Sequence, residues 1–116
     1  MDTYREEDGY KKVVLCGANS YEEKYYFNPD FAQLPTHVQE ELQILCVLYV
    51  ADVGGILTLV FDEEGTLQFE VMSQPDDFSF DEIGSQLKIK EIQRNQQDLL
   101  ESLQMFYRVF VQKEEE

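Results

Sequence analysis

Residues 80–111 read FDEIGSQLKIKEIQRNQQDLLESLQMFYRVFV and decide the fold, because they predict one long amphipathic helix. Apolar side chains recur there at alternating steps of three and four, the spacing of a helix-packing stripe. The stripe consists of Ile89, Ile92, Gln96, Leu99, Leu103, Phe106 and Phe110, and Gln96 is its single polar member. The opposite face carries charged and amide side chains, which is typical of a surface exposed to water.

The length of this helix raises the question of what covers its apolar stripe. About 30 residues at a rise of roughly 1.5 Å each span about 45 Å, whereas a domain of this size has a radius of gyration of about 13 Å. The helix is therefore expected either to break near Gly84-Ser85 and pack on its own sheet, or to project and need a partner. Our first prediction is a homodimer through this C-terminal helix, with an interface formed by Ile92, Gln96, Leu99, Leu103 and Phe106.

Residues 56–61 (ILTLVF) and 67–71 (LQFEV) predict a β-hairpin. Gly65, in the connection between them, suits the left-handed position of a short hairpin loop. If Asp62 lies opposite Thr66, six apolar side chains share one face of the hairpin. The pairs are Phe61 with Leu67, Leu59 with Phe69, and Leu57 with Val71, and their face is expected to form the core.

Two further elements are predicted before this hairpin. Residues 13–16 and 24–28 favour a first hairpin, connected through the turn-forming residues 17–20. A helix is expected from Pro35, which suits a first helical turn, to Asp52. Within it residues 44–50 are nearly all apolar, so its second half is expected to be buried on most sides.

The order β-β-α-β-β-α predicts an α+β two-layer sandwich, in which an antiparallel sheet of about four strands carries the helices on one face. We expect one domain over residues 13–111, a frayed lead-in over residues 1–12 and an acidic tail over residues 112–116. A chain of 116 residues is long enough to form a core without disulfides or metal ions.

The net charge of −15 is the strongest compositional feature, and no Lys or Arg lies between Lys24 and Lys88. Binding to nucleic acid or to an anionic membrane surface is disfavoured, because both need a basic surface. A basic protein partner is favoured instead, and acidic mimicry of nucleic acid is one alternative function. With no apolar run of membrane-spanning length and a polar N-terminus, the chain is expected to be cytoplasmic, with Cys16 and Cys46 reduced.

Few residues could support catalysis. The single histidine, His37, could activate Cys16 with Asn19 orienting the imidazole, which gives a small thiol-dependent hydrolase or transferase as a second alternative. No recognised nucleophile motif accompanies these residues, and a buried structural role is commoner for such a cysteine. Asp62-Glu63-Glu64 lacks the ligand spacing of a calcium loop, so no metal or cofactor is predicted. A non-enzymatic interaction or regulatory module is therefore preferred.

Several short stretches together resemble a known family. They are LCGANSY at 15–21, KYYFNP at 24–29, DVGG at 52–55, DEIGS at 81–85 and YRVF at 107–110. On these, the chain resembles a family of small, acidic, uncharacterised proteins from anaerobic Clostridia of the gut, over nearly all of residues 15–110. The resemblance implies a bacterial cytoplasmic origin and supplies no catalytic or binding residues.

Overall fold

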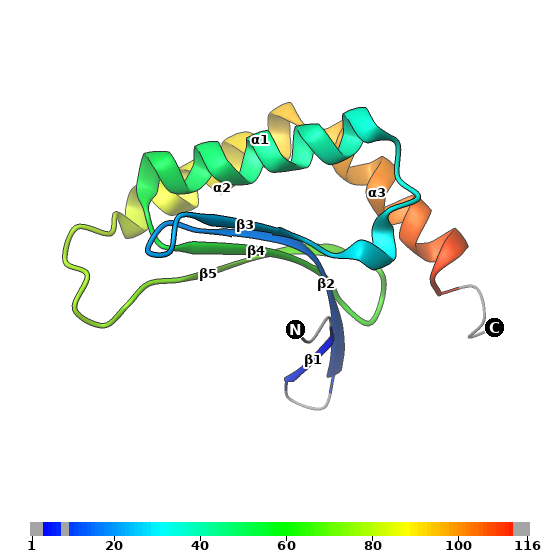
Figure 1. Ribbon diagram of the computed structural model, residues 1–116, viewed down its shortest axis with the longest axis horizontal. Coiled ribbons are helices and arrows are strands. Elements are labelled where there is room, and N and C mark those ends of the chain that lie inside the picture. The colour runs from blue at the N-terminus through cyan, green and yellow to red at the C-terminus, as the bar shows by residue number, and fades with distance from the viewer. Residues whose placement is uncertain (1–3, 8–9, 113–116) are drawn as a thin grey trace.

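A computed structural model describes residues 4–7 and 10–112, with side chains from Lys12 onward. In this part of the chain an antiparallel sheet is covered on one face by a layer of three α-helices (Figure 1). The strands are β1 (Tyr4–Glu7), β2 (Tyr10–Asn19), β3 (Lys24–Phe27), β4 (Ile56–Phe61) and β5 (Leu67–Met72). The helices are α1 (Thr36–Val53), α2 (Glu82–Asn95) and α3 (Gln97–Phe110), with a short 3₁₀ helix, η1 (Pro29–Phe31), before α1.

The sheet contains five strands but is only four strands wide, because β1 and β3 share one edge of β2. The first half of β2 pairs with β1 and the second half with β3, while its other edge pairs with β4, and β4 pairs with β5. The predicted antiparallel sheet with helices on one face is therefore confirmed. The predicted order of elements lacked β1 and placed no break between α2 and α3.

The hairpin of β4 and β5 has the predicted register: Phe61 pairs with Leu67, Leu59 with Phe69, and Leu57 with Val71. These side chains face the helices, and those of β4 are completely buried. Gly65 has the predicted positive φ of 83°. At the start of β5, the Leu67 amide, which points away from β4, donates to the Gln104 side chain of α3 at 2.9 Å.

The first hairpin differs from the prediction, because residues 17–19 continue strand β2 and the turn follows at residues 20–23. Gly17 lies so close to β4 that a Cβ atom there would be 2.7 Å from the Leu57 carbonyl oxygen. The glycine thus permits a close approach of two strands rather than a turn. The predicted lead-in also contains β1 and the start of β2. In the predicted tail, Gln112 donates to the Glu63 carbonyl oxygen at 2.8 Å, and residues 113–116 lie outside the described part.

The C-terminal helix breaks at Gln96 (φ −114°, ψ 27°) and not near Gly84-Ser85. Gly84 instead belongs to the capped first turn of α2, where its amide donates to Asp81 Oδ1 at 2.8 Å. A Cβ atom on Gly84 would lie 2.3 Å from the other Asp81 carboxylate oxygen, so the glycine makes room for the cap. The change of direction at Gln96 brings α3 over the hairpin end of the sheet, where Tyr107 stacks on Phe61 with ring centroids 4.2 Å apart.

The predicted dimer interface is largely used inside one subunit. Ile92 and Leu103 are buried in the core, and Leu99 and Phe106 pack against it. Gln96 is exposed at the break. The sheet and α1 therefore already cover most of the apolar side chains from which the homodimer was predicted, and the homodimer itself stays a prediction.

One buried polar contact joins α1 to α2. The hydroxyls of Tyr49 and Ser85 hydrogen-bond to each other, and both residues are almost completely buried. Burial raises the pKa of the Tyr49 phenol, and the hydrogen bond with Ser85 partly opposes that shift. The contact fixes the position of α2 relative to α1 because neither hydroxyl has water as an alternative partner.

We expect Ser85→Ala to lower the free energy of unfolding by about 1–3 kcal/mol, because the Tyr49 hydroxyl then loses its buried partner. Adding Tyr49→Phe is expected to recover part of that loss, since no polar atom then stays unpaired. Urea unfolding followed by circular dichroism measures both effects. Ser102→Ala, at an exposed site on α3, is the control and is expected to change stability by less than about 0.5 kcal/mol. Equal effects of the two serine substitutions would contradict the assignment.

Candidate functional site

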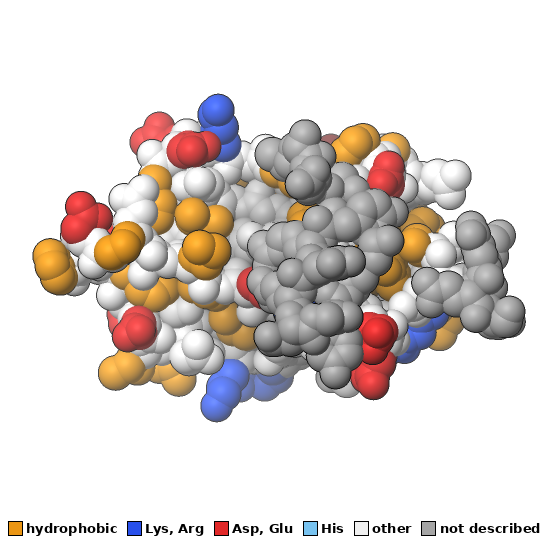
Figure 2. Space-filling model, turned by 90° about the horizontal axis from the view of Figure 1, so that it is seen from below, with side chains coloured by type: hydrophobic (Ala, Val, Ile, Leu, Met, Phe, Trp, Pro, Cys, Tyr) orange, Lys and Arg blue, Asp and Glu red, His pale blue; other side chains and the backbone are white. Residues whose placement is uncertain are grey.

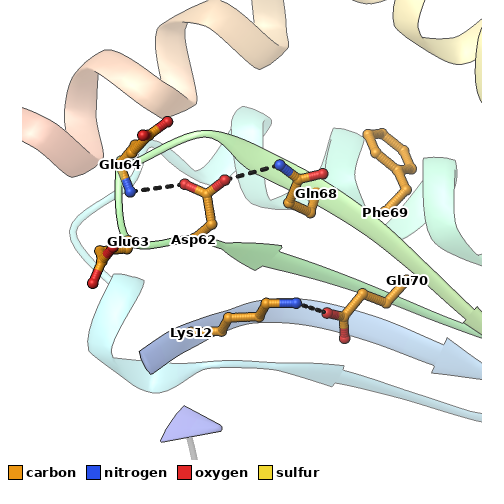
Figure 3. A pocket seen from close by; sticks show the side chains of 7 residues that line it. All are labelled: Lys12, Asp62, Glu63, Glu64, Gln68, Phe69 and Glu70. Atoms are coloured by element: carbon orange, nitrogen blue, oxygen red, sulfur yellow. Dashed lines mark hydrogen bonds and ion pairs between the residues drawn. The ribbon is translucent and has the colours of Figure 1, made fainter. Parts of the chain in front are cut away.

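An acidic hollow lies at the hairpin of β4 and β5, with a volume of about 360 Å³ (Figure 3). Its lining consists of Lys12, Asp62, Glu63, Glu64, Gln68, Phe69 and Glu70. Lys12 Nζ lies 2.8 Å from the Glu70 carboxylate and so joins β2 to β5 across β4. This ion pair supports the sheet rather than offering a free charged group to a ligand.

Asp62 organises the hairpin loop next to this hollow. One of its oxygens accepts from the amides of Glu64 and Thr66, and the other accepts from the Gln68 side chain, each at 2.9 Å. Burial alone would raise the pKa of Asp62, but these hydrogen bonds together lower it. Within residues 4–7 and 10–112 no group of three or more His, Cys, Asp or Glu is placed to hold a metal ion.

The two cysteines meet beneath α1. Cys16 Sγ on β2 lies 3.8 Å from Cys46 Sγ on α1, and both residues have no exposed surface. The pKa of the Tyr25 phenol is raised by burial and then by the neighbouring Cys16 and Cys46. The hydrogen bond with Cys16, and then burial, raises the pKa of Cys46. The two cysteines therefore form a buried pair of thiols in contact with each other.

The other residues of the thiol-histidine hypothesis lie in different settings. His37 is exposed in the first turn of α1. Asn19 Oδ1 accepts from the amides of Tyr21 and Glu22, so this side chain organises the turn after β2. The side-chain hydrogen bond described for the Cys16 thiol is with Cys46. This arrangement gives the catalytic alternative no support.

The outer face of α1 is the most unusual surface of the helical layer. Leu42, Leu45, Cys46 and Tyr49 face the sheet and are buried. Ile44, Val47 and Leu48 face outward, and their exposed fractions are 57%, 40% and 59%. The expectation that residues 44–50 are buried on most sides is therefore wrong, because no described element covers this outer ridge of α1 (Ile44, Val47 and Leu48).

A groove runs beside this ridge, between α1 and α2, with a volume of about 230 Å³. It is lined by Glu41, Ile44, Leu45, Leu48, Lys88, Glu91, Ile92, Asn95 and Gln96. Lys88 lies 3.0 Å from the Asp52 carboxylate and 3.5 Å from that of Glu91. The hydrogen bond to Asp52 is the main reason why the pKa of Lys88 is raised. With its only lysine shared by two carboxylates, the rim of the groove is acidic.

Other exposed apolar side chains are less continuous. Met72, Phe78, Ile83 and Leu87 lie near the end of β5 and the start of α2, and Met105, Val109 and Phe110 lie on the outer side of α3. Figure 2 shows further hydrophobic side chains on the left half of the sheet face turned away from the helices. Met72, Ile83 and Leu87 also line a groove, of about 510 Å³, but its charged residues are one acid and one base, Glu82 and Lys90, whereas acidic residues outnumber the single lysine in the groove of α1 and α2.

The sequence carried one signal for this surface, the apolar run at residues 44–50. A helix with apolar side chains on all sides cannot bury them all against a single sheet. We interpreted the run as core because the sequence does not show that α2 lies beside α1 and leaves the top of α1 open. Among the described helices, none combines the length and the hydropathy that a membrane span requires.

The comparisons with known proteins give one match. The model of a family described as "Family of unknown function (DUF6145)" matches residues 12–115. This supports the predicted resemblance to an uncharacterised family, while the origin in gut Clostridia stays a prediction. No curated protein and no solved structure matches the chain.

We expect neither cysteine to react with iodoacetamide near neutral pH in the folded protein, because both thiols are buried and the pKa of Cys46 is raised. Both are expected to react once the protein is unfolded in urea. Peptide mass spectrometry identifies the alkylated residues, and Ser102→Cys at an exposed position is the control that reacts in both conditions. Rapid alkylation of Cys16 alone in the folded protein would instead favour the thiol-dependent enzyme.

Proposed function

We propose that this chain, which belongs to the DUF6145 family, is a non-enzymatic protein-interaction module that binds an amphipathic helix of a partner protein between α1 and α2. The observation that carries the proposal is the outer ridge of α1, which stays exposed on a helix that is apolar on every side from residue 44 to residue 50. Amphipathic helices bind in this way, with apolar side chains anchored in a groove between helices.

The charge of the groove identifies the kind of helix. Glu41 and Glu91 line it together with Lys88, and Lys88 is engaged by Glu91 and by Asp52. A partner helix with Lys or Arg beside its apolar anchors would complement this rim, and the net charge of −15 would accelerate its approach. The proposed partner is therefore a basic amphipathic segment of another protein.

A second copy of the chain fits the same groove less well. Two α1 ridges packed against each other would bring two acidic rims together, and each chain carries a net charge of −15. Like charges at an interface weaken association and act against that partner. The homodimer predicted from the sequence is thus not part of this proposal.

Acidic mimicry of nucleic acid would also attract a basic protein, but through charge alone. The two functions differ in whether the apolar ridge contributes to binding. A substitution that removes an apolar contact and at the same time adds negative charge therefore separates them, because it weakens groove binding and strengthens attraction by charge.

We expect a fluorescent synthetic peptide of leucine and lysine, patterned as an amphipathic helix of about five turns, to bind the protein in fluorescence anisotropy. Leu48→Asp is expected to weaken binding about tenfold or more, since burying a leucine contributes about 1.5–3 kcal/mol and about 1.4 kcal/mol is a factor of ten. Ile44→Asp is expected to act in the same direction.

Met105→Asp on α3 is the matched control, because Met105 is 65% exposed and the substitution adds the same charge. It is expected to leave the affinity unchanged, and a peptide of leucine and glutamate is expected not to bind. Equal or tighter binding by Leu48→Asp would show that charge alone attracts the peptide and would overturn the groove proposal.

A further inference from the structure

The geometry points to a second property, independent of partner binding: we propose that Cys16 and Cys46 form an oxidisable dithiol that hydrogen peroxide closes to a disulfide. The two sulfur atoms lie 3.8 Å apart, on elements that are separated by 30 positions in the chain. A disulfide bond is about 2.05 Å long, so the sulfurs have to approach by somewhat less than 2 Å. Rotation of both side chains and a small shift of α1 toward β2 supply this approach.

Access to the dithiol leads past Tyr25. This residue belongs to β3, a strand of four residues that pairs only along the second half of β2. Its side chain is half-buried, and its hydroxyl oxygen is buried with no hydrogen-bond partner that meets normal geometry among the described residues. Tyr25 pairs with Ala18, so its side chain lies on the same face of the sheet as Cys16 and packs against the core, and we expect it to cover the thiols from solvent.

The size of the reagent decides whether it reaches the thiols. Hydrogen peroxide is close in size to a water molecule and can enter when the short edge strand β3 opens locally. Iodoacetamide is larger, so the lack of alkylation expected in the folded protein is compatible with oxidation by peroxide. The reaction is expected to be slow, because both thiols are buried and the pKa of Cys46 is raised.

The reaction balances with one molecule of peroxide. One cysteine, after losing its proton, attacks a peroxide oxygen, the O–O bond breaks, and the products are a sulfenic acid and water. The second thiol then attacks that sulfur, forms the S–S bond and releases the sulfenic oxygen as a second molecule of water. Two thiols are oxidised by two electrons in total, and the resulting bond links β2 to the inner face of α1.

Peptide mass spectrometry after exposure of the folded protein to hydrogen peroxide tests the proposal. The expected product is a Cys16–Cys46 disulfide, recognised by the loss of two hydrogen atoms and by its reversal with a thiol reductant. Oxidation of Met72 and Met105, which are both exposed, confirms in the same sample that the oxidant was active. Two free thiols in protein whose exposed methionines are fully oxidised would overturn the proposal.

The role of Tyr25 is tested with its neighbour as the control. Tyr25→Ala is expected to speed disulfide formation several-fold, because it removes the side chain that covers the thiols. Tyr26→Ala, on the same strand but with its side chain on the opposite face, is expected to keep the wild-type rate. Circular dichroism shows whether each variant is folded. Equal rates in the two folded variants would overturn the assignment of Tyr25 as the cover.

Cys46→Ser tests the pairing separately. With its partner gone, Cys16 is expected to gain oxygen as a sulfenic or sulfinic acid in place of forming an internal disulfide. A disulfide between two chains, formed by Cys16 in the wild-type protein, would overturn the internal pairing.

Discussion

The stacking of Tyr107 on Phe61 is the contact on which the arrangement of the helical layer depends. The two rings are nearly parallel, at 9°, and Phe31 adds a third aromatic ring to the same cluster. A straight helix over residues 82–110 would carry Tyr107 past the end of a short sheet. The break at Gln96 returns α3 to the hairpin end, where Leu100, Leu103 and Tyr107 are buried.

The path of α3 determines which surface of α1 is left uncovered. Since α3 closes the hairpin end of the core and α2 lies along one side of α1, the remaining side of α1 faces outward. The apolar residues of α1 therefore serve two purposes, the inner ones as core and the outer ones as an exposed ridge. The ridge and the buried dithiol lie on opposite sides of the same helix, with Cys46 between Leu45 and Val47 in the sequence.

Local patterns in the sequence were sufficient for the hairpin of β4 and β5, because its register follows from alternation and from one glycine with positive φ. Gly17 and Gly84 were misinterpreted because their reasons lie elsewhere: Gly17 avoids the Leu57 carbonyl of another strand, and Gly84 makes room for the Asp81 cap. The meeting of Cys16 with Cys46 and the exposure of Leu48 could not be predicted either. Both depend on how α1 packs on the sheet, and the spacing of residues along the sequence does not reveal that packing.

The hydrogen bond between the Leu67 amide and Gln104 has a consequence for solubility during folding and storage. An outer strand such as β5 presents free backbone groups, on which a strand of another molecule can add and start aggregation. The first outward amide of β5 is occupied by α3, and Arg108 of α3 and Gln112 after it also bond to the hairpin loop, so β5 offers a shorter template. Helix α3, which completes the core, thus also hinders edge-to-edge polymerisation.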